Sequence, residues 1–174
     1  MGKIKPHHKV KLIIGLIFKE NQVYDKAKLA LEELFGKIDF ESQTIPFNHT
    51  DYYEKEFGKN LIRKFISFKK LISPEKISCI KCATNNIELN LSLNGLRRIN
   101  IDPGYLDLAK LILVSTKDYK HRIYLTKGIF AEITLSYQNN TFQSWEWTYP
   151  DYSTQEYIGI FNRIRNIYIG QIKE

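Results

Sequence analysis

The stretch KVKLIIGLIF, residues 9–18, is a short apolar run that is closed by the charged pair Lys19-Glu20. A run of this length with polar boundaries is typical of a strand buried in a sheet, and it is too short to span a membrane. Because no small-residue cleavage site follows it, we do not expect a secretory signal. The sequence therefore predicts a soluble, cytoplasmic protein that contains a buried strand at this position.

Helices and strands are expected to alternate after this run. Asn21 and Gly36 are suited to the two ends of one helix, and Ser73-Pro74 is a typical start for another that ends near Asn94. The expected elements of the first half are strand 9–18, helix 22–35, extended segment 38–47, strand 61–69, helix 74–94 and extended segment 97–101. The order β-α-β-β-α-β predicts a ferredoxin-like first half.

The second half is expected to be an antiparallel β-meander followed by a C-terminal helix. We expect a turn at Asp102-Pro103-Gly104, since Pro-Gly pairs mark turns. Its expected strands are 110–116, 121–126, 129–137 and 141–147. Residues 153–156 (STQE) match a capping box at the start of the last helix. The sequence thus predicts an α+β fold in a single globular domain, residues 1–174, with residues 1–8 as a flexible N-terminal tail.

The chain is basic, with a net charge of +7 and a pI of about 9.3. A basic protein favours anionic partners such as nucleotides, RNA or acidic surfaces, although charge alone specifies no fold. Two cysteines occur, Cys79 and Cys82, inside the second expected helix. A redox pair should instead open a helix after a strand, and a zinc site needs further ligands, so we interpret them as two thiols one turn apart.

The segment STKDYKHRIYLTKG, residues 115–128, leads into an expected hairpin with a three-residue loop at 126–128. This register places Arg122 opposite Glu132 on one face and His121 opposite Ile133 on the other face. The first pair predicts a cross-strand salt bridge. Because histidine titrates near neutral pH, His121 is a candidate acid, base or phosphate partner, although a structural role is the more common one.

Three Asp-Tyr pairs occur, at 51–52, 118–119 and 151–152, where random composition gives about 0.4. They fall in expected turns, as does the spaced pair Asp102 and Tyr105. Each aspartate can simply cap its own turn. The functional interpretation is that these loops converge on one rim, where tyrosines stack on a ring and cations hold phosphate.

Several nucleotide and hydrolase motifs are missing. The chain has no G-x-x-x-x-G-K-[ST] phosphate loop and no G-x-G-x-x-G after the first strand. It also has no H-E-x-x-H and no G-x-S-x-G. Thr116-Lys117-Asp118 is similar to a guanine-reading element but lacks one residue. Because the phosphate loop is absent, we exclude the fold of P-loop GTPases.

Several segments in order resemble a bacterial family described as domain of unknown function 4416, some of whose members carry a GTP-binding label. They are PFNHTDYYEKEFG, RRINIDPGYLDLAKLILVSTKDYKHRIYL, KGIFAEITLSY and WTYPDY. The resemblance covers about residues 9–169 and implies a small cytosolic prokaryotic protein. It also directs attention to residues such as Asn100, Asp102 and Glu132.

The main hypothesis is that a phosphate-bearing ligand, a nucleotide or an RNA end, binds at the rim, with hydrolase or transferase chemistry as its extension. His121 would then be the general acid or base, oriented by Asp118 or Asp102. The expected ligand-binding residues are Asp51, Tyr52, Arg98, Asn100, Tyr105, Lys117, Arg122, Glu132 and Tyr149.

The alternative hypothesis is a non-enzymatic basic module that binds RNA or protein. The cofactor is left open, and a divalent metal ion is an option if Asp102, Asp118 and Glu132 converge. The oligomeric state is left open.

Overall fold

A computed structural model describes residues 2–48, 50 and 52–173. Its helices and strands are, in chain order, β1 (Lys11–Phe18), α1 (Asn21–Phe35), β2 (Ile38–Glu41), β3 (Ile45–Phe47), α2 (Glu54–Phe57), β4 (Leu61–Phe68), the 3-10 helix η1 (Pro74–Lys76), α3 (Ile77–Asn90), β5 (Ile99–Leu106), β6 (Lys110–Ser115), β7 (Ile123–Thr126), β8 (Ile129–Gln138), β9 (Thr141–Ser144) and α4 (Gln155–Lys173).

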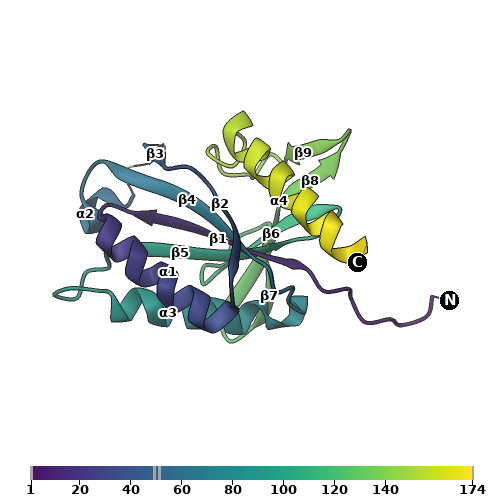
Figure 1. The fold of residues 1–174 in the computed structure, drawn as a ribbon, viewed down its shortest axis with the longest axis horizontal. Helices are drawn as coiled ribbons and strands as arrows, with labels where there is room; N and C mark the ends of the chain where they lie inside the picture. Colours follow the sequence, from purple (N-terminus) through teal and green to yellow (C-terminus); the bar gives the residue numbers. More distant parts are fainter. Residues whose placement is uncertain (1, 49, 51, 174) are drawn as a thin grey trace.

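Nine strands of the described residues form one sheet, in the order β2-β4-β1-β5-β6-β8-β7, with β3 also paired to β4 and β9 to β8. The pairings are antiparallel. Helices α1 and α3 cover one face of this sheet, and α4 packs on the other face near β8 and β9 (Figure 1). The predicted α+β class, with an antiparallel extension and a C-terminal helix, is confirmed.

Strand β1 is buried on both faces because it runs through the middle of the sheet. Leu12, Ile14 and Leu16 belong to the core beneath α1 and α3. Ile13 points to the opposite core, which α4 covers. The near-continuous apolar sequence of residues 9–18 therefore reflects burial on two sides, as the sequence predicts.

The predicted helix boundaries need three corrections. Helix α1 begins at Asn21, and no side chain caps it. Helix α3 ends at Asn90 rather than near Asn94, because the chain turns back in a bridge between Leu93 and Leu96. The capping box at 153–156 is wrong, since it is the Thr154 hydroxyl that accepts the N–H of Tyr157, at 3.3 Å, and so caps α4.

The turn predicted at Asp102-Pro103-Gly104 is also wrong. Strand β5 continues through these residues and stays paired with β1 along its whole length. The chain reverses later, where Asp107 accepts the N–H groups of Ala109 at 2.7 Å and Lys110 at 2.8 Å. Strand β5 tolerates Pro103 because antiparallel alternation directs its missing N–H away from β1.

The hairpin of β7 and β8 has the predicted pairs Ile123–Ala131 and Tyr124–Phe130. Its loop is shorter than predicted, because Thr126 pairs with Ile129 and leaves Leu125 out of register. Lys127 and Gly128 both have positive φ, of 56° and 72°. A two-residue loop of this kind matches the twist of the flanking strands. The strand expected at 141–147 ends at Ser144.

Glu41 at the end of β2 provides a test of the fold through pH. The Nζ atoms of Lys28 and Lys64 donate to its two oxygens, at 2.6 and 2.5 Å. Burial by itself would raise the pKa of Glu41, but these hydrogen bonds outweigh it and lower the pKa from 4.5 to about 2. The stabilisation is therefore complete above pH 4.5 and is lost as the pH falls toward 2.

We expect Glu41→Gln to lower the free energy of unfolding by about 2 kcal/mol at pH 7. The difference from the unmodified protein should shrink steadily below pH 4.5. Urea unfolding at pH 7, 4 and 2.5 measures it, with the exposed Glu33→Gln on α1 as the control. A difference that does not change with pH would contradict the prediction.

Candidate functional site

The sheet opens between β5 and β6. These two strands pair only where Gly104, Tyr105 and Leu106 meet residues 111–113. Side chains of α3 take the place of a strand beside the remaining part of β5. Glu88 accepts the backbone N–H of Ile101 at 2.5 Å, and Lys81 donates to the carbonyl oxygen of Ile101 at 2.9 Å. This pairing explains why two charged side chains of α3 are buried.

A cavity of about 810 Å³ lies at this opening. Its volume is within the range of known small-molecule sites. The cationic side chains among its described lining residues are Arg63, Lys81, Arg97, Lys117 and Arg122. The carboxylates are Glu88, Asp102, Glu132 and Asp151. The tyrosines are Tyr52, Tyr53, Tyr149 and Tyr152. The cavity therefore combines charged side chains of both signs with several aromatic rings.

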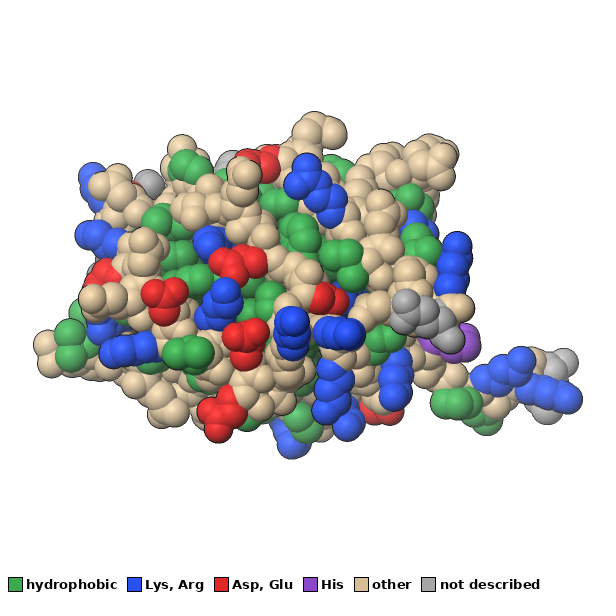
Figure 2. Space-filling view, viewed as in Figure 1, with side chains coloured by type: hydrophobic (Ala, Val, Ile, Leu, Met, Phe, Trp, Pro, Cys, Tyr) green, Lys and Arg blue, Asp and Glu red, His purple; other side chains and the backbone are tan. Residues whose placement is uncertain are grey.

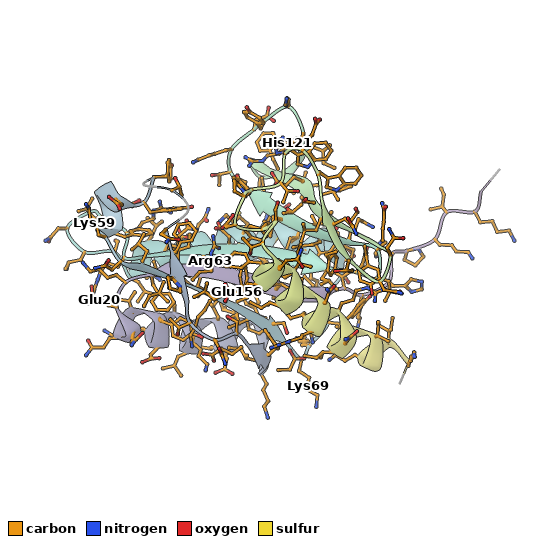
Figure 3. All side chains as sticks on the ribbon, turned by 90° about the horizontal axis from the view of Figure 1, so that it is seen from above. Glu20, Lys59, Arg63, Lys69, His121 and Glu156 are labelled. Carbon is orange, nitrogen blue, oxygen red and sulfur yellow. The ribbon has the colours of Figure 1, made fainter. Side chains whose placement is uncertain are left out.

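Arg63 of β4 is buried at the cavity wall and lies in the middle of the molecule (Figure 3). Its Nη2 donates to Asp151 at 3.1 Å, whereas its Nε and Nη1 have no hydrogen-bond partner within the described residues. The Cζ atom lies 5.4 Å from the ring centroid of Phe65 and 5.6 Å from that of Tyr152. Gly15 of β1 leaves room for the guanidinium, since a Cβ there would lie 2.9 Å from Nη1.

Arg97 joins α2, α3 and β5 in one hydrogen-bond network. Its Nε and Nη2 donate to Glu56 at 2.8 and 2.7 Å, and its Nη1 donates to Glu88 at 3.0 Å and to Asn100 at 3.1 Å. Asn100 in turn donates to Asp102 at 2.6 Å. Burial raises the pKa of Glu88 despite the opposing effect of Lys81. Each nitrogen of Arg97 is therefore already in use.

A second network surrounds Glu132 of β8. One oxygen of this buried carboxylate accepts Nε of Arg122 at 2.7 Å and contacts Nε2 of His121 at 3.1 Å. The other nitrogens of Arg122 donate to the Lys117 carbonyl at 2.8 Å and to the Tyr149 hydroxyl at 2.6 Å. The predicted Arg122–Glu132 salt bridge is confirmed, but it is buried, with side chains that are 7% and 3% exposed.

The mouth of the cavity is formed by Lys117 and Tyr52. The Lys117 ammonium donates to the Tyr52 hydroxyl at 2.8 Å and lies 4.4 Å from the centre of its ring. Burial raises the pKa of Tyr149, so its hydroxyl stays neutral beside Arg122 at ordinary pH. The rings and hydroxyls of both tyrosines line the mouth of the cavity.

The structure brings together seven residues that the sequence predicts as site residues. They line the same cavity and are Tyr52, Asn100, Asp102, Lys117, Arg122, Glu132 and Tyr149. Arg98 and Asp118 are not among its lining residues. Arg98 forms an ion pair with Glu20 at 2.6 Å, and Asp118 is exposed. Asp51 lies outside the described residues.

His121 and Tyr105 line a second cavity of about 690 Å³, which is mostly apolar. His121 precedes β7 and is not paired with Ile133 in the sheet, but both residues line this second cavity, and Nε2 of His121 contacts Glu132. It stacks on Trp147, with ring centroids 5.6 Å apart, and its Nδ1 has no hydrogen-bond partner in the described chain. Glu132 lines both cavities and so stands between them.

The structure also bears on the predicted metal site and on the two cysteines. No group of three or more His, Cys, Asp or Glu side chains suited to a metal ion occurs within residues 2–48, 50 and 52–173. Cys79 and Cys82 are free thiols on α3. The Lys127 ammonium lies 3.3 Å from the sulfur of Cys79.

Comparison with known proteins gives a single result. A model of the family described as "Domain of unknown function (DUF4416)" matches residues 8–168. The chain belongs to the DUF4416 family. No curated protein and no solved structure matches it.

The matched range of the DUF4416 chain contains every residue that lines the two cavities. The family description carries no activity, so the function of this DUF4416 protein must be argued from the site itself. None of the helices in the described ranges combines the length and the apolar character that a membrane span requires.

Several cavity residues of this DUF4416 chain are absent from the sequence-based set. They are Arg63, Lys81, Glu88 and Arg97. The sequence does contain one indication for Arg63. Its side chain falls on the same buried face of the strand as Leu61 and Phe65, where an apolar residue is expected. Lys81 and Glu88 gave no such signal, because a charged helix residue is normally solvated.

Proposed function

We propose that the cavity at the β5–β6 opening binds a small phosphate-bearing ligand of about the size of a nucleotide. The observation that carries this proposal is the convergence of seven sequence-predicted residues from distant segments on one cavity. Had each residue only fastened its own turn, the seven would be spread over the surface. A volume of about 810 Å³ suits a mononucleotide better than a folded nucleic acid.

The hydrogen bonds within the site indicate which cations are available to phosphate. Every nitrogen of Arg97 and Arg122 already donates to a protein acceptor. Arg97 thereby uses four of its five N–H groups and Arg122 three, and both hold neighbouring side chains in position. Lys117 uses one of its three N–H groups, on Tyr52, so it retains donors for a phosphate at the mouth.

Tyr52 and Tyr149 supply the second part of the proposed recognition. Aromatic rings stack on nucleobases with little dependence on sequence, and each stacked base contributes about 1–3 kcal/mol. A nucleotide with its phosphate at Lys117 would have both rings within the same cavity mouth. The geometry supports binding more than catalysis, because His121 reaches this cavity only through Glu132.

We also infer that the first half has the ferredoxin-like arrangement. The order β2-β4-β1-β5 and the position of α1 and α3 on one face support this interpretation. The proposed site then lies on the edge of that unit, where its last strand meets the meander.

The alternative is that the basic surface binds RNA without a cavity ligand. Figure 2 shows basic side chains mixed with acidic ones over the face that carries α1, which favours the cavity over this face as the anion site. Under the alternative, RNA affinity would fall steeply with salt and would not depend on Lys117.

We expect nucleoside di- and triphosphates to raise the melting temperature, and Lys117→Gln to weaken their binding about tenfold. A charge-assisted hydrogen bond contributes about 1.5–3 kcal/mol, and exposure reduces its effect here. Thermal shift followed by isothermal titration calorimetry at 50 and 300 mM NaCl measures both. The control is Lys120→Gln, an exposed lysine of the same segment outside the cavity. Equal losses in the two variants would contradict the proposed site.

A further inference from the structure

Arg63 is the cationic lining residue whose donors are least satisfied. Within the described residues its Nε and Nη1 are buried and have no hydrogen-bond partner. Its side chain is 4% exposed, its Nη2 donates to Asp151, and the Tyr157 hydroxyl also interacts with the guanidinium. A guanidinium carries five N–H donors, and a buried donor left without an acceptor is unfavourable. Asp151 and the Tyr157 hydroxyl do not accept all five of these donors, so the guanidinium has room for a further acceptor.

Aromatic rings surround this guanidinium but do not supply the missing acceptor. Phe47, Phe65 and Tyr152 lie with their ring centroids 4.9, 5.4 and 5.6 Å from Cζ. Such contacts stabilise the positive charge and hold the side chain in place. A caged arginine of this kind resembles the preorganised forks that bind phosphate or carboxylate in two-pronged contacts.

Tyr152 and Gly15 define the space beside the guanidinium. The Tyr152 hydroxyl lies 3.2 Å, and Nη1 of Arg63 2.9 Å, from the point where a Cβ on Gly15 would be. A side chain there would press on both groups. Burial raises the pKa of Tyr152 well above its ordinary value, so its hydroxyl remains protonated and able to donate. Two donors thus face the same part of the cavity wall.

We propose that Arg63 and the Tyr152 hydroxyl form a deep subsite for a phosphate group of the ligand, and that Asp151 is the resident carboxylate which this phosphate displaces. The inference rests on the proposed function, because it names where in the cavity one phosphate is bound. A two-pronged contact with a guanidinium uses neighbouring nitrogens, so it shares Nη2 with Asp151. Nη2 has a second N–H for the phosphate, but the negative charge of Asp151 on the same nitrogen repels it, so the two anions compete for the guanidinium.

This competition predicts that removing the charge of Asp151 increases the affinity for phosphate. An ion pair with a purely structural role would not produce such an increase. Asp151→Asn removes the competing charge, so inorganic phosphate should bind at least tenfold more tightly than to the unmodified protein. The gain should disappear in the double variant Asp151→Asn/Arg63→Lys, which keeps the positive charge but loses the planar fork. Phosphate is titrated against chloride at constant ionic strength, with calorimetry as the readout.

Asp102→Asn is the matched control. It also removes one carboxylate from the cavity, but Asp102 contacts Lys81 and Asn100 rather than Arg63. A gain in phosphate affinity from the lost charge alone would be similar in both single variants. Equal gains would therefore overturn the proposal, and a gain confined to Asp151→Asn would support it.

If the Asp151→Asn variant does not fold, a measurement on the unmodified protein tests the Arg63 subsite. The Nε–H resonance of Arg63, assigned by its loss in Arg63→Lys, should shift on addition of phosphate. An unchanged resonance, while nucleotides bind in a Lys117-dependent way, rejects the subsite and leaves the proposed function standing. Absence of binding by every phosphate compound tested rejects both.

Discussion

Gly104→Ala is expected to destabilise the protein by about 3 kcal/mol, near the upper end of the typical cost of overpacking. A Cβ at this position would lie 2.3 Å from the carbonyl oxygen of Ile112 and 2.7 Å from Cδ2 of Leu113. The first of these atoms belongs to the backbone of β6, so no side-chain rotation relieves the contact. Strands β5 and β6 would have to separate at the point where their pairing begins.

Urea unfolding of the alanine variant measures the loss, with Gly170→Ala as the control. A Cβ at Gly170 in α4 would meet no atom within 4 Å outside its neighbours and its own helix backbone. Alanine also favours a helix, so that variant should be slightly more stable. Because Gly104 borders the cavity opening, we also expect weaker nucleotide binding by any folded fraction. Similar stabilities of the two alanine variants would show that β5 and β6 are further apart in solution.

Glu132→Gln should destabilise the protein by about 3–5 kcal/mol, the usual cost of breaking a buried ion pair at one partner. The substitution leaves the Arg122 side chain, 7% exposed, without its buried counter-ion. It also removes the charge that His121 contacts at 3.1 Å. Arg122 would then hold Tyr149 and the Lys117 carbonyl less firmly, so the mouth of the cavity should loosen.

Denaturant unfolding at pH 7 provides the stability, and the exposed Glu146→Gln is the control. Replacing Arg122 and Glu132 together by methionine should be less harmful than the two single losses combined, since no unpaired charge remains buried. Additive losses, or a Glu132→Gln variant as stable as the Glu146→Gln control, would contradict a coupled pair at this position.

The order of helices and strands was predictable because each element carries a local pattern. Residues 9–18 show burial on both faces, and residues 123–131 match apolar partners across a hairpin. The break in prediction at Asp102-Pro103-Gly104 has a clear cause. Pro-Gly normally ends a strand. Here Pro103 faces the opening of the sheet, where no neighbouring strand needs a backbone N–H from it, and Gly104 is required because a side chain there would collide with Ile112.

The site was predictable only in part, for a related reason. Tyr52, Lys117 and Tyr149 stand out in the sequence because polar and aromatic residues gather in loops. Lys81 and Glu88 are buried because no strand pairs with β5 at Ile101, so their side chains bond to its backbone instead. The local sequence does not show which strands lack a neighbour. Arg63 likewise depends on Gly15, which lies 48 positions earlier in the chain, on the adjacent strand.

The side chains of α3 that occupy the backbone of Ile101 have one more consequence. A sheet with an interrupted pairing normally invites a foreign peptide to add itself as an extra strand, in folding as in aggregation. At Ile101 the N–H and the carbonyl oxygen are already taken by Glu88 and Lys81. The side chains of α3 therefore leave no free backbone group at Ile101 to which a foreign strand could bind.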